Sequence, residues 1–173
     1  MLSVGLFASL LVCLAEWSGS HPTAPAAVSL SAVERMLEAA GLWPGDVLLN
    51  LGCGDGRIPV VAAKLYGIRA IGVDIDPGCV LLARKTAKLN RIDELATFWQ
   101  GDARNCNCRG ATVLVLSLPP STVDELYPRL RRLPPGVRVV AGSKCLPNWL
   151  SQNVVRIDDE QTECLAEGGM SNE

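Results

Sequence analysis

The stretch LLNLGCGDGRIPV, residues 48–60, places three glycines within five residues directly after an apolar run. Glycine permits positive φ and leaves no Cβ between the backbone N–H groups and a ligand. We therefore expect Gly52, Gly54 and Gly56 to form a loop that approaches a small molecule closely. The alternative is a tight turn between a strand and a helix that binds nothing.

Two aspartates follow later apolar runs in a similar way. Asp74 ends the run IGVD, 18 residues after Gly56. This is close to the offset at which a carboxylate reaches the ribose hydroxyls of an adenosine cofactor. Asp102, in QGDA, ends the next run. Either aspartate alone is a common turn or cap residue, but their joint placement favours a shared binding edge.

The glycine spacing separates two classes of adenosine cofactor. Dinucleotide sites use GxGxxG, with the pyrophosphate over the start of a helix. Here the spacing is GxGxG, and Asp55 adds a negative charge that would repel a pyrophosphate. A ligand that carries a sulfonium and an amino group tolerates this charge, so a nicotinamide-dependent dehydrogenase is the less favoured interpretation.

The elements that must position these residues alternate along the chain. Between the expected strands we expect helices over 57–66, over 77–90 with Asp76 as N-cap and Pro77 as first residue, and over 122–133. This rhythm predicts an α/β fold, Rossmann-like and doubly wound, with a mostly parallel sheet and helices on both faces. Ligands bind at the carboxyl ends of such strands. The expected strands cover residues 47–51, 68–73, 96–100, 112–118 and 137–141.

Both ends of this alternating region carry further expected elements. Ser31 is the expected N-cap of a preceding helix, with Glu34 three residues later, and Gly41 is expected to end that helix. After the fifth strand, residues 154–157 and 162–165 are candidates for a final hairpin.

Composition restricts the class of protein. The chain has 173 residues, 49% of them hydrophobic, and a formal net charge of -2, so we expect one enzyme-sized domain and no nucleic-acid partner. Among its seven cysteines, Cys106 and Cys108 form a CxC pair without a second pair at a zinc-like spacing, and His21 is the only histidine. We therefore expect no metal site.

The amino-terminal residues differ from the rest. Residues 2–15 are uncharged and almost wholly apolar, but fourteen residues are fewer than the roughly 20 that span a bilayer as a helix. A cleaved signal, a membrane-surface anchor and a mistaken start site all remain open. We assign residues 1–20 to this hydrophobic segment, 21–28 to a linker and 29–173 to the folded domain.

From Leu48 to about Trp149 the chain resembles class I S-adenosylmethionine-dependent methyltransferases of the seven-strand type, with a carboxyl end that looks shortened. The resemblance implies that NLGCGDG holds the methionyl part of the cofactor, that Asp74 holds the ribose, and that Asp102 and Ala103 flank the adenine. Asn50 departs from the family, where the position is commonly acidic, so we expect weaker binding. The cofactor-binding residues implied in this way are Asn50, Gly52, Cys53, Gly54, Asp55, Gly56, Asp74, Ile75, Asp102 and Ala103.

A narrower resemblance rests on GDGRI, LSLPPS and LPPGVRVVAGSKCLPNW. These segments are similar to the protein-lysine methyltransferases that modify the ATP synthase c subunit and the adenine nucleotide translocase, and to their bacterial relatives. The resemblance implies lysine N-methylation of a membrane-associated protein. It leaves the catalytic residue unassigned. The substrate-side candidates are Pro119, Pro120, Ser121, Lys144 and Trp149.

Other functions remain open. A small-molecule methyltransferase would not need the hydrophobic amino end, and a protein that binds the cofactor with little or no turnover would be consistent with Asn50. Because S-adenosylmethionine is a cytosolic metabolite, we expect a cytosol-facing domain held at a membrane by residues 1–15. The alternatives are a cytoplasmic protein or, after signal cleavage, an exported one.

Overall fold

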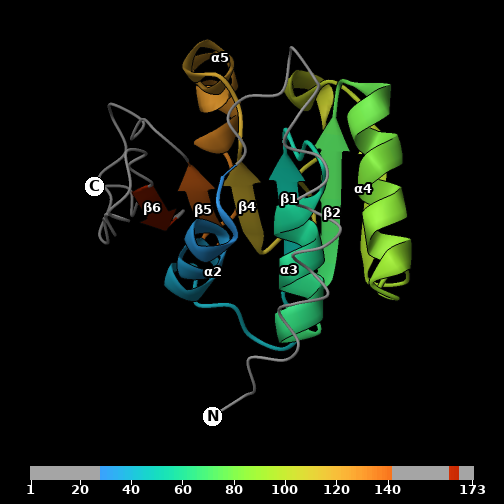
Figure 1. Cartoon of the computed structure of the whole chain (residues 1–173). Helices are drawn as coiled ribbons and strands as arrows, with labels where there is room; N and C mark the ends of the chain where they lie inside the picture. The colour runs from blue at the N-terminus through green and yellow to red at the C-terminus, as the bar shows by residue number, and fades with distance from the viewer. Residues whose placement is uncertain (1–27, 142–163, 168–173) are drawn as a thin grey trace.

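The structure is a computed structural model that describes residues 28–141 and 164–167. Within these residues, a single sheet of six strands organises the fold (Figure 1). The spatial order is β3-β2-β1-β4-β5-β6. Strands β1 to β5 are parallel, and β6 runs antiparallel to β5. The expected Rossmann-like, mostly parallel sheet is confirmed. The strands are β1 (Val47–Leu51), β2 (Arg69–Asp74), β3 (Ala96–Gln100), β4 (Val113–Leu116), β5 (Arg138–Ala141) and β6 (Cys164–Glu167).

Helices pack on both faces of the sheet. Buried residues of α2, α3 and α4 form one hydrophobic cluster with one face, and buried residues of α5 form a second cluster with the other. Neighbouring residues of β1 divide between the two clusters, as the alternation of side chains along a strand requires. The helices are α2 (Leu30–Ala39), α3 (Arg57–Tyr66), α4 (Pro77–Leu89) and α5 (Pro120–Leu130), with the short 3-10 helix η2 (Ala103–Asn105).

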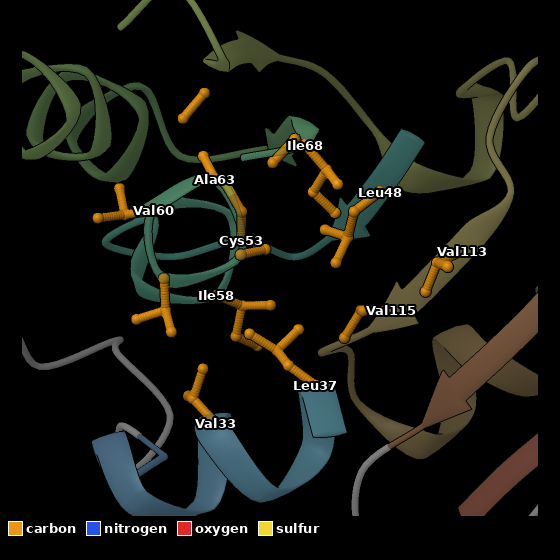
Figure 2. Packing of buried hydrophobic residues seen from close by; sticks show 14 of the residues in the cluster. Val33, Leu37, Leu48, Cys53, Ile58, Val60, Ala63, Ile68, Val113 and Val115 are labelled. Carbon is orange, nitrogen blue, oxygen red and sulfur yellow. The ribbon is translucent and has the colours of Figure 1, made fainter. Parts of the chain in front are cut away.

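The first cluster places α3 beneath the glycine loop. Figure 2 shows Leu37 of α2 directed toward Ile58 of α3 and toward Val115 of β4. Leu37 is fully buried, and burying a side chain of this size stabilises the fold by about 1.5–3 kcal/mol. The start of α3, and with it the loop that precedes it, is therefore fixed by core packing.

The amino end of α2 differs from the prediction. The N-cap is Ser29, whose hydroxyl accepts a hydrogen bond from the backbone N–H of Ala32 at 3.2 Å, so the expected cap at Ser31 is wrong. The partly buried Leu30 packs against the core, which draws the first turn two residues earlier. Gly41, with φ of 56°, follows the helix end as predicted.

The prolines account for another shifted boundary. The expected strand 112–118 ends at Leu116, and α5 begins at Pro120 instead of residue 122. Pro119 is the N-cap and Pro120 the first helical residue, where a missing N–H costs no helical hydrogen bond. The bounds of β1, α3 and β3 match the prediction, whereas β6 lies two residues beyond the expected 162–165. The expected strand 154–157 lies outside the described residues.

A polar network joins the strands at their amino ends. Asp46, 8% exposed, accepts hydrogen bonds from the Thr112 hydroxyl at 2.6 Å and from the Trp43 backbone N–H at 2.6 Å, and it forms an ion pair with Arg138. Arg138 also donates to the Ala40 carbonyl at the end of α2. Burial raises the pKa of Asp46, but the hydrogen bonds from Thr112, Trp43 and Arg138 outweigh burial and lower it.

Candidate functional site

The glycine loop closes on the neighbouring strand β2. The backbone N–H groups of Gly52 and Cys53 both donate to the Val73 carbonyl, at 2.8 and 3.0 Å. Gly52 has φ of 77°, and a Cβ there would lie 2.3 Å from the Ser117 carbonyl oxygen. Glycine at position 52 is therefore required by the protein's own backbone after β4.

The other two glycines serve different purposes. Gly56 has φ of 80°, and a Cβ there would lie 2.6 Å from the Ala83 Cβ and 2.8 Å from the Phe98 ring, so its small size allows α3 to pack on α4 and β3. Gly54 has φ of 54°, and nothing lies within 4 Å of a Cβ placed there. Of the three glycines in this loop, Gly54 is the one that combines a left-handed backbone with open space.

Asp74 connects the loop to the end of β2. Its Oδ2 accepts a hydrogen bond from the Gly54 N–H at 2.7 Å, and its Oδ1 accepts one from the Asp76 N–H at 3.0 Å. A carboxylate has about four acceptor positions, so the half-buried Asp74 keeps capacity on both oxygens. The neighbouring Ile75 is 65% exposed.

The residues after β3 lie at the same edge of the sheet. The Gly101 N–H donates to the Asp74 carbonyl at 2.9 Å, which ties this loop to β2. Asp102 caps η2 and forms an ion pair with Arg104 at 2.9 Å, and Arg104 also pairs with Glu125 at 3.3 Å. The hydrogen bonds from Arg104 lower the pKa of Asp102. Ala103 is buried behind it.

Asn50 is fully buried on β1, and its amide is only half used. Its Nδ2 donates to the Val115 carbonyl at 3.2 Å and to the Ser117 hydroxyl at 3.1 Å. Because the Val115 carbonyl can only accept, the nitrogen must be on that side. The opposite atom, Oδ1, is buried without a hydrogen-bond partner, which is an unfavourable state for a carbonyl-type acceptor.

Asp55 has a partner that was not anticipated. Its carboxylate, 7% exposed, pairs with Arg57, which donates from Nε to Oδ1 at 2.9 Å. Arg57 also donates to the Val28 carbonyl, ahead of α2. The charge of Asp55, which was expected to act on the ligand, is therefore balanced within the protein. Sequence reasoning missed Arg57 although GDGR places it two residues from Asp55, and it missed Ser117 in LSLPPS.

Cys53 is not suited to be a nucleophile. Burial, followed by the neighbouring charge of Asp74, raises the pKa of the Cys53 thiol well above its usual range. Burial likewise raises the pKa of Cys79 to about 11. Because the thiolate is the reactive form, both side chains stay protonated near neutral pH. Across residues 28–141 and 164–167, no three His, Cys, Asp or Glu side chains are grouped to hold a metal ion.

The substrate-side candidates divide between described and undescribed parts. Pro119, Pro120 and Ser121 are exposed at the start of α5. The loop that carries them adjoins the glycine loop, since Ser117 and Leu118 supply the atoms nearest to a Cβ at Gly52. Lys144 and Trp149 lie outside the described residues.

Comparison with known proteins places this geometry in a family. A family model described as the ANTKMT methyltransferase domain matches residues 50–153. This chain belongs to that family. A protein-lysine N-methyltransferase of Saccharolobus islandicus is 33% identical over 129 residues, which is 73% of this chain and 80% of that protein.

Further relatives extend the comparison. A ribosomal protein L11 methyltransferase of Mannheimia succiniciproducens is 31% identical over 120 residues, but the match spans 69% of this chain and only 38% of that relative. The structure of an RNA methyltransferase from Salinibacter ruber, in complex with S-adenosyl-L-homocysteine, superposes with a TM-score of 0.77 at 35% identity, covering 85% of this chain and 97% of that one. The chain is an S-adenosylmethionine-dependent methyltransferase.

The residues of the site fit this cofactor. Gly54 offers open space beside the loop, Asp74 has acceptor capacity for hydroxyl groups, and Asn50 has an unused buried acceptor on the neighbouring strand. When bound, the cofactor supplies a methyl group on a sulfonium for in-line transfer to a nucleophile.

Within residues 28–141 and 164–167, no helix meets the length and hydropathy needed to cross a membrane.

Proposed function

We propose that this methyltransferase modifies the ε-amino group of lysine in a protein, and that the acceptor is membrane-associated. The observation that carries the proposal is the similarity to the protein-lysine N-methyltransferase of Saccharolobus islandicus across 80% of its length. The ANTKMT methyltransferase domain match over residues 50–153 supports the same substrate class.

For the cofactor, we propose the residues expected from the sequence, with roles refined by their contacts. Asp74 accepts from the ribose hydroxyls, since both of its oxygens keep acceptor capacity after their backbone hydrogen bonds. Gly54 lines the open side of the loop. Asn50 Oδ1 orients the methionyl end as an acceptor, directly or through water. Cys53, Asp55 and Gly56 shape the loop, and Ile75, Asp102 and Ala103 border the adenine.

On the acceptor side, the chain must favour a neutral amine. A lysine nucleophile attacks only after losing its proton, and an apolar environment disfavours the ammonium. Leu118 lies next to the glycine loop and is followed by the exposed Pro119 and Pro120, so a docked acceptor would complete an apolar environment there. A proline also donates no backbone N–H that would compete for the lone pair. Ser121 follows within the first turn of α5. Their contribution is to orient the amine and exclude water.

The first experiment is calorimetric titration of the full chain with S-adenosylmethionine and, separately, with NAD. We expect binding of S-adenosylmethionine alone and a loss of at least about tenfold in affinity for Asp74→Ala, since one hydrogen bond to a charged group contributes about 1.5–3 kcal/mol. Asp93→Ala is the matched control, because Asp93 is exposed between α4 and β3. Equal affinities for the two variants would exclude the proposed role of Asp74.

Transfer is tested next, with a radiolabelled methyl group and membrane and soluble extracts as acceptors. We expect label in protease-sensitive material of the membrane fraction, released as methyllysine on acid hydrolysis. The similarity to the Salinibacter ruber RNA methyltransferase makes RNA the second candidate acceptor, and it predicts label that is removed by ribonuclease. Label in soluble metabolites would indicate a small-molecule methyltransferase, and cofactor binding without transfer a binding protein.

The membrane part of the proposal concerns residues 1–15. We propose that this segment, uncharged and almost wholly apolar from residue 2, holds the domain at a cytosol-facing membrane surface. Fractionation of cells that express the full chain is expected to recover it with membranes, and a version that begins at His21 is expected to be found in the supernatant. Equal partitioning of the two versions would exclude the anchor.

A further inference from the structure

One connection between parallel strands lacks a regular helix. The connections after β1, β2 and β4 carry helices of 10, 13 and 11 residues, whereas the connection from β3 to β4 carries only the three-residue η2. Parallel sheets normally have both faces covered by helices. Among the residues that the structure describes, 28–141 and 164–167, the loop over residues 101–112 takes the place of a helix over β1 to β3 on the face opposite α3 and α4.

A groove of about 470 Å³ lies on this face. The strand register brings its floor together, because Leu49 pairs with Ile71 and Val73 pairs with Trp99. The loop over residues 105–111 forms part of its lining. The floor is apolar: Leu49 and Val73 are buried in it, Val47 and Ile71 are half-buried, and Trp99 is 61% exposed beside them.

The end of the groove that lies at the amino ends of β1 and β2 is cationic. Arg69, the first residue of β2, pairs in register with Val47, and Thr112, three residues after Arg109, donates its N–H to the Val47 carbonyl. Both arginines are exposed, line the groove and take part in no ion pair with any residue in the described ranges. At the other end, the charge of Asp102 is balanced by Arg104.

We propose that this groove binds an acidic amphipathic helix of a partner protein, which under the proposed function is the methyl acceptor. A helix is about 10 Å across with its side chains, and the described residues place no regular helix over this part of the sheet. An apolar stripe contacts the accessible part of the floor, Val47, Ile71 and Trp99, and carboxylates pair with the two arginines at its end. The carboxyl end of the groove reaches Gly101 and Asp102, so a docked segment ends beside the cofactor edge.

The same features favour a protein over RNA. Single-stranded nucleic acid binds to several aromatic side chains along a track of many cations. Here the floor is mainly aliphatic, Trp99 is the one aromatic side chain among the lining residues that the structure describes, and the chain carries a net charge of -2.

The test measures binding of a synthetic amphipathic helix with a leucine stripe bordered by glutamates to the full chain, by fluorescence anisotropy. A copy with lysines in place of the glutamates and a single-stranded RNA oligonucleotide are the comparison probes. The variants are Arg69→Glu, Arg109→Glu and their combination. Lys85→Glu is the matched control, since Lys85 is exposed on α4, which packs on the other face of the sheet.

We expect the acidic helix to bind with a dissociation constant below about 100 µM, and each arginine reversal to weaken binding about fivefold, the range of exposed charge pairs. Lys85→Glu leaves binding unchanged, and the double variant prefers the lysine copy. Absence of binding, equal binding by all variants, or binding of RNA alone overturns the proposal. S-adenosylmethionine affinity, measured on the same samples, reports separately on the proposed function and is expected to be the same in all variants.

Discussion

The amino ends of the strands form one edge of the sheet and their carboxyl ends form the other. The polar groups at these two edges differ in how they are hydrogen-bonded. At the amino edge, the Asp46 carboxylate is hydrogen-bonded by Trp43 and Thr112 and paired with Arg138. At the carboxyl edge, Asn50 keeps a buried acceptor without a partner, and Gly54 faces open space. Buried polar groups are normally satisfied within the protein. The comparison therefore attributes stability to the amino edge, and it supports the proposal that the ligand binds at the carboxyl edge.

The largest expected effect concerns the amino edge. Replacing Asp46 by alanine leaves the Arg138 guanidinium, whose side chain is 16% exposed, without its charge partner. Removing one partner of a buried ion pair costs about 3–5 kcal/mol. We expect a loss of this size in the free energy of unfolding, measured with urea, while the folded fraction keeps its cofactor affinity. A loss of affinity in the folded protein would contradict the division between the edges.

A pair of glycine substitutions sharpens the comparison within the loop. Gly56→Ala introduces overlaps with Ala83 and Phe98 at positive φ and is expected to destabilise the fold by about 2–4 kcal/mol. Gly54→Ala meets no atom and costs about 1–2 kcal/mol for its backbone alone. We expect Gly54→Ala to lose at least about tenfold in S-adenosylmethionine affinity, because the added Cβ would occupy the open space proposed for the cofactor; a tenfold loss corresponds to about 1.4 kcal/mol. Calorimetry and thermal unfolding of both variants measure the two quantities.

Asn50→Leu separates binding from stability at a single residue. The substitution removes the unsatisfied acceptor together with two donated hydrogen bonds, so we expect the free energy of unfolding to change by no more than about 1 kcal/mol. Cofactor affinity is expected to fall about tenfold through the lost acceptor. Unchanged affinity would show that Oδ1 does not face the ligand.

The smallest expected effect is a pH dependence. The folded-state pKa of Asp46 is lowered, so its contribution to stability is fully present above the unfolded value of about 3.9 and is lost as the pH falls from there through the folded value. We expect Asp46→Asn to flatten this part of the stability curve, measured by urea unfolding between about pH 5 and pH 3. Asp102 also has a lowered pKa, but it lies at the surface, and Asp102→Asn is expected to leave the curve unchanged.

Most of the fold could be predicted from the sequence, because capping and turn residues mark where its strands and helices begin and end. Asp76 followed by Pro77 predicted the start of α4, where the Asp76 carboxylate accepts a hydrogen bond from the Gly78 N–H. At α2, Ser29 and Ser31 are equivalent as caps by local chemistry. The packing of Leu30 on the core decides between them, and a tertiary contact of this kind leaves no local signal.

The sequence predicted which residues meet at this edge of the sheet, but not which side chains pair with one another there. The spacing of the glycines, Asp74 and Asp102 correctly predicted that these residues meet at one edge, as the hydrogen bonds from Gly54 and Gly101 to Asp74 show. The commitment of Asp55 to Arg57, and the contact of Asn50 with Ser117, depend on side-chain directions across separate segments. The cofactor roles of these residues stay predictions.

The contact between Arg57 and the Val28 carbonyl has a consequence for reach. It fixes the point where the chain enters the domain next to the loop that begins α3. Twelve residues, 16–27, separate that point from the apolar segment, and an extended chain of this length spans at most about 40 Å. If residues 1–15 rest on a membrane, this tether limits the distance that the domain can move from it, and under the proposed function only lysines within about that height of the lipid surface are accessible to the enzyme.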